Sequence, residues 1–292
     1  MTYDSTGLAP RTVLGLFAPL VPPHRPHGSV VGSQQRRSGQ KLMGLFGRRV
    51  LGCVQIPSDV TLEDEAPPFA EKMGVDLEMA KVTFDSEDIC AGTYLRAMHR
   101  EELTKGAKLL ALAAASRGRS CDILGLSCTS FSFTLGSAKV REQISAGYPG
   151  VPVTDMATAQ LEALKALKAQ RVALLTPYIE ELSRANAEML ETMGQVQVVN
   201  RLTMNLPRDE LTSAVPPAEI AEWAVRVDRP EADVVVIGCS GFRACQPDFL
   251  DPLEARLGKP VVTSTQAFLW HMARRAGAEE KIEGYGTLLS KH

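Results

Sequence analysis

Short apolar runs alternate with polar loops and helical patterns from about residue 49 to the end of this chain. The runs expected to form strands are Val50–Ile56, Val75–Phe84, Ile123–Leu126, Pro149–Thr154, Arg171–Leu175, Val196–Val199, Val234–Ile237 and Pro260–Val262. An acidic helix is expected after Thr61, and further helices over about Arg100–Arg117, Gly136–Ile144, Met156–Lys168, Ile179–Thr192, Pro217–Val227 and Gln266–Ala276. Strands that alternate with helices predict an α/β fold with parallel sheets.

Parts of this pattern occur twice. The segment DILGLSC from Asp122 to Cys128 matches DVVVIGC from Asp233 to Cys239, at an offset of 239 − 128 = 111 residues. Arg-Val pairs at residues 49 and 171 open comparable strands, and a Gly-X-Pro-Val segment starts at residues 150 and 258. Three landmarks in the same order predict two pseudo-symmetric domains. Each would be a small parallel sheet flanked by helices, with the active site in the cleft between them.

These landmarks also suggest domain boundaries. Residues 48–155 would form the first α/β half, completed by a C-terminal helical segment 265–292, and residues 156–264 the second half. Residues 1–47 are rich in Pro, Arg and Gly without periodicity, so we expect a poorly ordered extension. Met43 lies just before the first strand, and we expect the native chain to start near it.

Composition narrows the class of protein. Of 292 residues, 45% are hydrophobic and the formal net charge is −2, which is typical of a globular domain with a sizeable core. The sequence has no basic patch of the kind that predicts nucleic-acid binding. It also has no apolar run long enough to span a membrane. The run Thr12–Val21 follows Asp4 and makes a poor signal peptide, so we expect a cytoplasmic protein. The six cysteines form no CxxC pair, which argues against a metal site.

In parallel α/β sheets, ligands bind beyond the carboxyl ends of the strands. The loops expected to line a shared cleft are Pro57–Thr61, Cys128–Ser132, Thr176–Tyr178 and Cys239–Phe242. Backbone N–H groups there are expected to lower the pKa of both cysteines and, with the hydroxyls of Thr129, Ser130 and Ser240, to hold a substrate carboxylate. Two thiols on opposite faces of one carbon can act as base and acid, or one can add to an electron-poor alkene.

Ordinary structural roles compete with these interpretations. A cysteine at a strand end is often only a small buried apolar residue, although the repeated placement of Cys128 and Cys239 argues for function. Two roles suit Tyr178 equally well: an ordinary half-buried tyrosine and a phenol directed at the cleft. Asp59, which follows Ser58 in the first loop, fits a helix cap. Structural or surface roles are expected for Cys53, Cys90, Cys121, Cys245, His99 and His271.

The strand–cysteine loops, Ser127–Phe133, the segment LLTPYI ending at Ile179, and Gly284-Tyr285-Gly286 resemble the aspartate/glutamate/hydantoin racemase superfamily. Within it, Arg49 to Leu288 is most similar to the branch that contains maleate cis-trans isomerase and arylmalonate decarboxylase. The resemblance implies a cofactor-free enzyme with its active site between two pseudo-symmetric domains. It also suggests a homo-oligomer.

The resemblance assigns roles to matching positions. Cys239 would supply a proton, and Cys128 matches the first cysteine of racemases and isomerases, where decarboxylases have glycine. Thr129, Ser130 and Tyr178 match groups that hold a substrate carboxylate or stabilise an enediolate. The remaining residues expected to bind substrate are Ser58, Asp59, Ser240 and Gly241.

Departures from the family pattern bear on the substrate. Asp59 stands where isomerases and racemases usually have Asn, and an ionised Asp would repel a dicarboxylate unless its side chain points away. Ser240-Gly241 replaces the Thr-His of many glutamate racemases, which argues against glutamate. The leading hypothesis is a two-cysteine isomerase acting on a small carboxylate or dicarboxylate, by cis-trans isomerisation or racemisation. The alternatives are an arylmalonate-type decarboxylase that uses Cys239 as proton donor and a non-catalytic carboxylate-binding protein.

Overall fold

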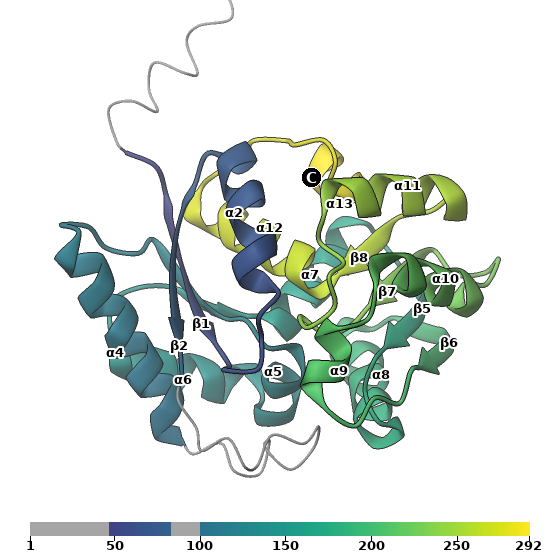
Figure 1. Cartoon of the computed structure of the whole chain (residues 1–292), viewed down its shortest axis with the longest axis horizontal. Coiled ribbons are helices and arrows are strands. Elements are labelled where there is room, and N and C mark those ends of the chain that lie inside the picture. The colour runs from purple at the N-terminus through teal and green to yellow at the C-terminus, as the bar shows by residue number, and fades with distance from the viewer. Residues whose placement is uncertain (1–46, 83–99) are drawn as a thin grey trace, which may run out of the picture. The chain divides into compact units, whose positions relative to one another are not determined.

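The computed structural model describes residues 47–82 and 100–292, which contain two parallel four-stranded sheets (Figure 1). The first, in the order β2-β1-β3-β4, consists of β1 (Val50–Gln55), β2 (Asp76–Lys81), β3 (Ile123–Leu126) and β4 (Val153–Asp155). The second, in the order β6-β5-β7-β8, consists of β5 (Arg171–Thr176), β6 (Gln197–Thr203), β7 (Val234–Ile237) and β8 (Val261–Thr263). The two orders are equivalent, so the predicted α/β class with two pseudo-symmetric sheets is confirmed. The domain boundaries stay predictions, and the extension 1–46 lies outside the described residues.

Helices flank both sheets. In the first half of the described chain they are α2 (Leu62–Met73), α4 (Arg100–Ser116), α5 (Thr129–Leu135) and α6 (Ser137–Gly147). The later ones are α7 (Met156–Ala166), α8 (Glu180–Gly194), α9 (Asp209–Ser213), α10 (Pro217–Val227), α11 (Pro247–Leu257), α12 (Ser264–Ala276) and α13 (Gly286–Lys291). Within the described ranges no helix is long and apolar enough to cross a membrane.

Four of these helices were not predicted. The segment Cys128–Ser132, expected as a loop, is helical from Thr129 onward. Its Ser and Thr residues have low helix propensity in isolation, but the Ser132 hydroxyl donates to the Cys128 carbonyl at 2.6 Å and helps to close the first turn. The helices α9 and α13 are one to two turns long, and α11 contains Pro252, so none of them presents a clear period.

The repeated Asp of the sequence pattern joins neighbouring strands in both sheets. Asp122, just before β3, accepts hydrogen bonds from the Val50 N–H at 2.8 Å and from the Arg49 guanidinium at 3.0 Å. Asp233, just before β7, accepts from the Arg171 N–H and guanidinium, both at 2.9 Å. Each carboxylate thus fixes the start of the cysteine-bearing strand against the start of its neighbour, which explains this part of the repeat.

Helices α7 and α12 lie against each other and contact strands of both sheets: α7 contacts β4 and β8, and α12 contacts β1, β3 and β8 (Figure 1). Their apolar side chains belong to a core that continues from one sheet to the other. A close approach occurs at Gly125 in β3, where a Cβ atom would lie 2.5 Å from the ring of Phe268 in α12. The absence of a side chain at Gly125 therefore lets α12 lie directly on the strand that carries Cys128.

We expect Gly125→Ala to lower the free energy of unfolding by about 1–3 kcal/mol, because the added methyl group overlaps the buried Phe268 ring. Chemical denaturation measures the change. In the double variant Gly125→Ala/Phe268→Leu, the smaller leucine side chain leaves space for the added methyl group. The decrease in the free energy of unfolding should therefore be less than the sum of the decreases in the two single variants. Full additivity would contradict this contact between β3 and α12.

Candidate active site

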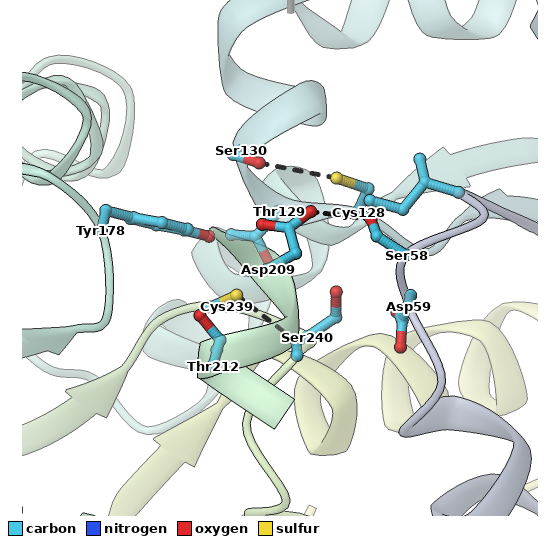
Figure 2. A pocket seen from close by; sticks show the side chains of 12 residues that line it. Ser58, Asp59, Cys128, Thr129, Ser130, Tyr178, Asp209, Thr212, Cys239 and Ser240 are labelled. Atoms are coloured by element: carbon cyan, nitrogen blue, oxygen red, sulfur yellow. Dashed lines mark hydrogen bonds between the residues drawn. The ribbon is translucent and has the colours of Figure 1, made fainter. Parts of the chain in front are cut away.

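A small pocket lies where loops that follow β1, β3, β5 and β7 meet (Figure 2). Its open space is about 320 Å³, a figure that includes solvent at its mouth. The pocket is lined by Ile56, Ser58, Asp59, Cys128, Thr129, Ser130, Tyr178, Asp209, Thr212, Cys239, Ser240 and Gly241. All nine residues expected to act on or bind the substrate are therefore brought together, although their roles stay predictions.

Cys128 reaches the pocket from the carboxyl end of β3. The backbone of Ser127 still pairs with β1, donating to the Val54 carbonyl at 2.9 Å, and Cys128 then begins α5 in an extended conformation. Its side chain is 2% exposed, and its sulfur lies 3.5 Å from the Ser130 hydroxyl. The strand end and the first helical turn thus hold this thiol in one place.

Cys239 reaches the pocket from the carboxyl end of β7 with an unusual backbone. Its φ angle is +95°, which is costly for a residue with a side chain and is found most often at functional sites. The conformation is held by the Cys239 N–H, which donates to Ser264 Oγ at 2.9 Å. The Gly241 N–H donates to the Cys239 sulfur at 3.3 Å. Figure 2 shows the Cys128 and Cys239 sulfurs on different walls of the pocket.

The environment of the thiols differs from the expected one. Exclusion of water by the surrounding protein raises the pKa of Cys128 to about 12, which hydrogen bonds from Ser130 and the Phe131 N–H only partly offset. The pKa of Cys239 is raised by the same desolvation and then by the charge of Asp209, against a lowering contribution from Tyr178. The expected lowering of both values is therefore wrong, because burial outweighs the N–H groups of the loops.

Asp59 lies at the pocket wall with its carboxylate turned away from the thiols (Figure 2). Its Oδ1 accepts from the Thr61 N–H at 3.1 Å and from the Leu62 N–H at 3.4 Å, so its contacts are those of a cap on α2. Burial raises its pKa, and hydrogen bonds from Ser240 and Thr61 partly offset this effect. Repulsion of a dicarboxylate by Asp59 is thus reduced by its orientation.

Tyr178 follows β5 and is only 5% exposed. Its ring packs edge-to-face against Phe133, with the ring centroids 6.3 Å apart. Figure 2 shows the phenol directed into the pocket, on the same side as Ser130 and Cys239. Of the two interpretations left by the sequence, the geometry favours a tyrosine that serves the pocket.

Asp209 and Thr212 are pocket residues that sequence reasoning missed. Both lie on α9, which follows β6, and Asp209 Oδ2 accepts a hydrogen bond from the Ser58 hydroxyl at 2.7 Å. The three repeated sequence landmarks do not include this segment, so a search for repeated features did not find it. The available signal was its place after a strand of the second sheet, since that strand ends at the same edge as β5 and β7.

Other candidates lie away from this pocket. Cys53, Cys121 and Cys245 are buried elsewhere, and His271 is buried in α12. His99 and Cys90 lie outside the described residues. Across residues 47–82 and 100–292, no group of three or more His, Cys, Asp and Glu side chains has an arrangement that could hold a metal ion.

A titration tests the environment of Cys128. The thiolate absorbance at about 240 nm is measured in the wild-type protein and in Cys128→Ala. Between about pH 6 and 9 the two should not differ, because the pKa of the Cys128 thiol lies far above this range. Cys121→Ala, which removes a cysteine outside the pocket, serves as the matched control. A titration step of Cys128 below about pH 9 would show that the pocket stabilises its thiolate.

Three comparisons relate the chain to known proteins. A family model described as arylmalonate decarboxylase matches residues 66–289. Arylmalonate decarboxylase of Bordetella bronchiseptica is 32% identical over 179 residues, which cover 58% of this chain and 71% of that protein. Maleate isomerase of Pseudomonas putida is 26% identical over 248 residues, covering 82% of this chain and 96% of the relative.

The fold is also that of a solved structure. Maleate cis-trans isomerase of Nocardia farcinica, in a variant with a covalently bound succinylcysteine intermediate, superposes with a TM-score of 0.74 at 23% identity. The match covers 84% of this chain and all of that protein. At this level of identity the likeness concerns the fold.

Proposed function

Because this chain belongs to the arylmalonate decarboxylase family, we propose that it is a cofactor-independent isomerase that uses two cysteine thiols on a small carboxylate. The family resemblance predicted from the sequence is confirmed by this match. The observation that carries the proposed reaction is the presence of Cys128 and Cys239, from different sheets, in the wall of one pocket. A reaction that needs only one thiol gives no reason for the second.

The proposed cis-trans reaction begins when Cys128 gives up its proton to solvent and its sulfur adds to one alkene carbon. A C–S bond forms, the π bond breaks, and its electron pair moves to the neighbouring carbon, where the adjacent carboxylate stabilises it as an enediolate. Rotation about the new single bond follows. Elimination then breaks the C–S bond, restores the alkene and returns the electron pair to sulfur, which takes up a proton from solvent again. Cys239 can protonate the carbanion and remove that proton again, so no net oxidation or proton change occurs.

The pocket offers groups that suit this chemistry. The hydroxyls of Thr129, Ser130 and Ser240 and the Gly241 N–H are hydrogen-bond donors around the thiols, and we propose that they hold the reacting carboxylate. The phenol of Tyr178 points into the same space and would stabilise the enediolate. Racemisation at a carbon next to a carboxylate would use the same groups, with one thiol on each face.

Decarboxylation is the second candidate, and the family match favours it. There a C–C bond to carbon dioxide breaks, its electron pair forms the enediolate, and Cys239 donates the proton. Cys128 has no required part in these steps. Its position at the pocket wall is the reason to place isomerisation first. A binding protein without catalysis is a weaker alternative, because binding gives no reason for two thiols in one small pocket.

Nuclear magnetic resonance in heavy water distinguishes these reactions with a panel of small mono- and dicarboxylates. We expect a change of alkene geometry or deuterium exchange at the carbon next to the carboxylate. Cys128→Ala and Cys239→Ala should each lower turnover by about 10²-fold or more, because each removes a reacting group. Cys121→Ala, which removes a thiol outside the pocket, is the matched control. Carbon dioxide release that survives Cys128→Ala would replace the isomerase proposal with a decarboxylase.

The sequence and the family resemblance support a proposal for the setting of the enzyme. We propose a cytoplasmic protein that assembles as a homo-oligomer and needs neither nucleic acid nor a membrane.

A further inference from the structure

Asp209 is an acidic residue of the pocket that the proposed reaction does not use. It is the first residue of α9, and Figure 2 shows its side chain in the middle of the pocket, among Ser58, Thr129 and Tyr178. Its charge reaches both thiols, since it contributes to the raised pKa of Cys128 and of Cys239. A ligand in contact with the thiols therefore lies close to this carboxyl group.

The hydrogen bond to Ser58 indicates what Asp209 would accept. Ser58 Oγ donates to Asp209 Oδ2 at 2.7 Å, which partly offsets the rise in the Asp209 pKa caused by burial. Toward Ser58 the carboxylate is an acceptor. Within the described part of the chain, no second hydrogen bond to the Asp209 side chain is present. A ligand that brings an N–H or O–H group would supply one.

The charge balance of the pocket points the same way. Among the described residues that line it, none is Lys, Arg or His. The other acid, Asp59, has its Oδ1 engaged with the start of α2. Hydroxyls and N–H groups near the thiols can hold one substrate carboxylate. A second carboxylate beside Asp209 would meet a like charge with poor screening and no compensating cation.

We propose that Asp209 determines specificity by selecting small monocarboxylates that carry a hydrogen-bond donor, a primary amide being the simplest, at the end away from the reacting carboxylate. Dicarboxylates are rejected at that end. This inference rests on the proposed function and names its substrate class.

Binding measures the selectivity independently of turnover. Isothermal titration with succinamate and succinate, which are saturated and differ only in one terminal group, should show succinamate binding at least about tenfold more tightly. Asp209→Asn removes the charge at nearly constant volume and should reduce this preference about tenfold or more, mainly by improving the binding of succinate. Circular dichroism and a thermal melt check that the variant is folded.

Kinetics apply the same test to the reaction. The ratio of kcat/KM for maleamate over maleate should exceed about ten in the wild-type enzyme and fall in Asp209→Asn. Glu210→Gln is the matched control, because it removes the neighbouring, exposed carboxylate, which does not line the pocket. Its ratio should stay unchanged.

The outcomes separate the two proposals. If no carboxylate of the panel is turned over but succinamate is preferred and Asp209→Asn abolishes the preference, the specificity inference stands and the isomerase proposal fails. If the wild-type protein prefers succinate, or a folded Asp209→Asn keeps the same preference, the specificity inference is overturned whatever the reaction.

Discussion

The contact of the helix pair α7–α12 with both parallel sheets fixes the two thiol-bearing strand ends relative to each other. The strand ends of both sheets form the pocket, and α12 contacts strands of both. At Gly125, β3 and α12 approach so closely that no room remains for even a methyl group between them. Three residues later the chain reaches Cys128. At the other wall, Ser264 at the start of α12 accepts the hydrogen bond that holds the Cys239 backbone. The same helix thus helps to position both thiols.

Both thiols are buried and lie near the carboxyl group of Asp209. Burial raises the pKa of Cys128 and Cys239, and Asp209 raises both further. A protonated thiol suits the donation of a proton to a carbanion, whereas addition to an alkene requires thiolate. The positive φ angle of Cys239 also costs conformational free energy at this pocket. Such costs are common where a site is organised for chemistry and not for stability.

The sequence was sufficient to predict what the repeat encodes. Asp122 and Asp233 mark equivalent strands because each carboxylate joins two strand ends, and the cysteines that follow occupy equivalent places in the two sheets. Features outside the repeat were not predicted. Asp209 lies on a helix too short to show a period, and its hydrogen bond with Ser58 joins residues 151 positions apart. The direction of the pKa shift of both cysteines was not predicted either, because it depends on burial by segments distant in the sequence.

The proposed mechanism requires both thiols to act on one substrate, with Cys128 forming the bond to carbon. Mass spectrometry of folded Cys239→Ala after incubation with maleamate and with maleate tests it most directly. Without the second thiol, the adduct should accumulate on the peptide that contains Cys128, with an added mass equal to the intact substrate. Modification of a different residue, or continued isomerisation without any adduct on Cys128, would contradict the account.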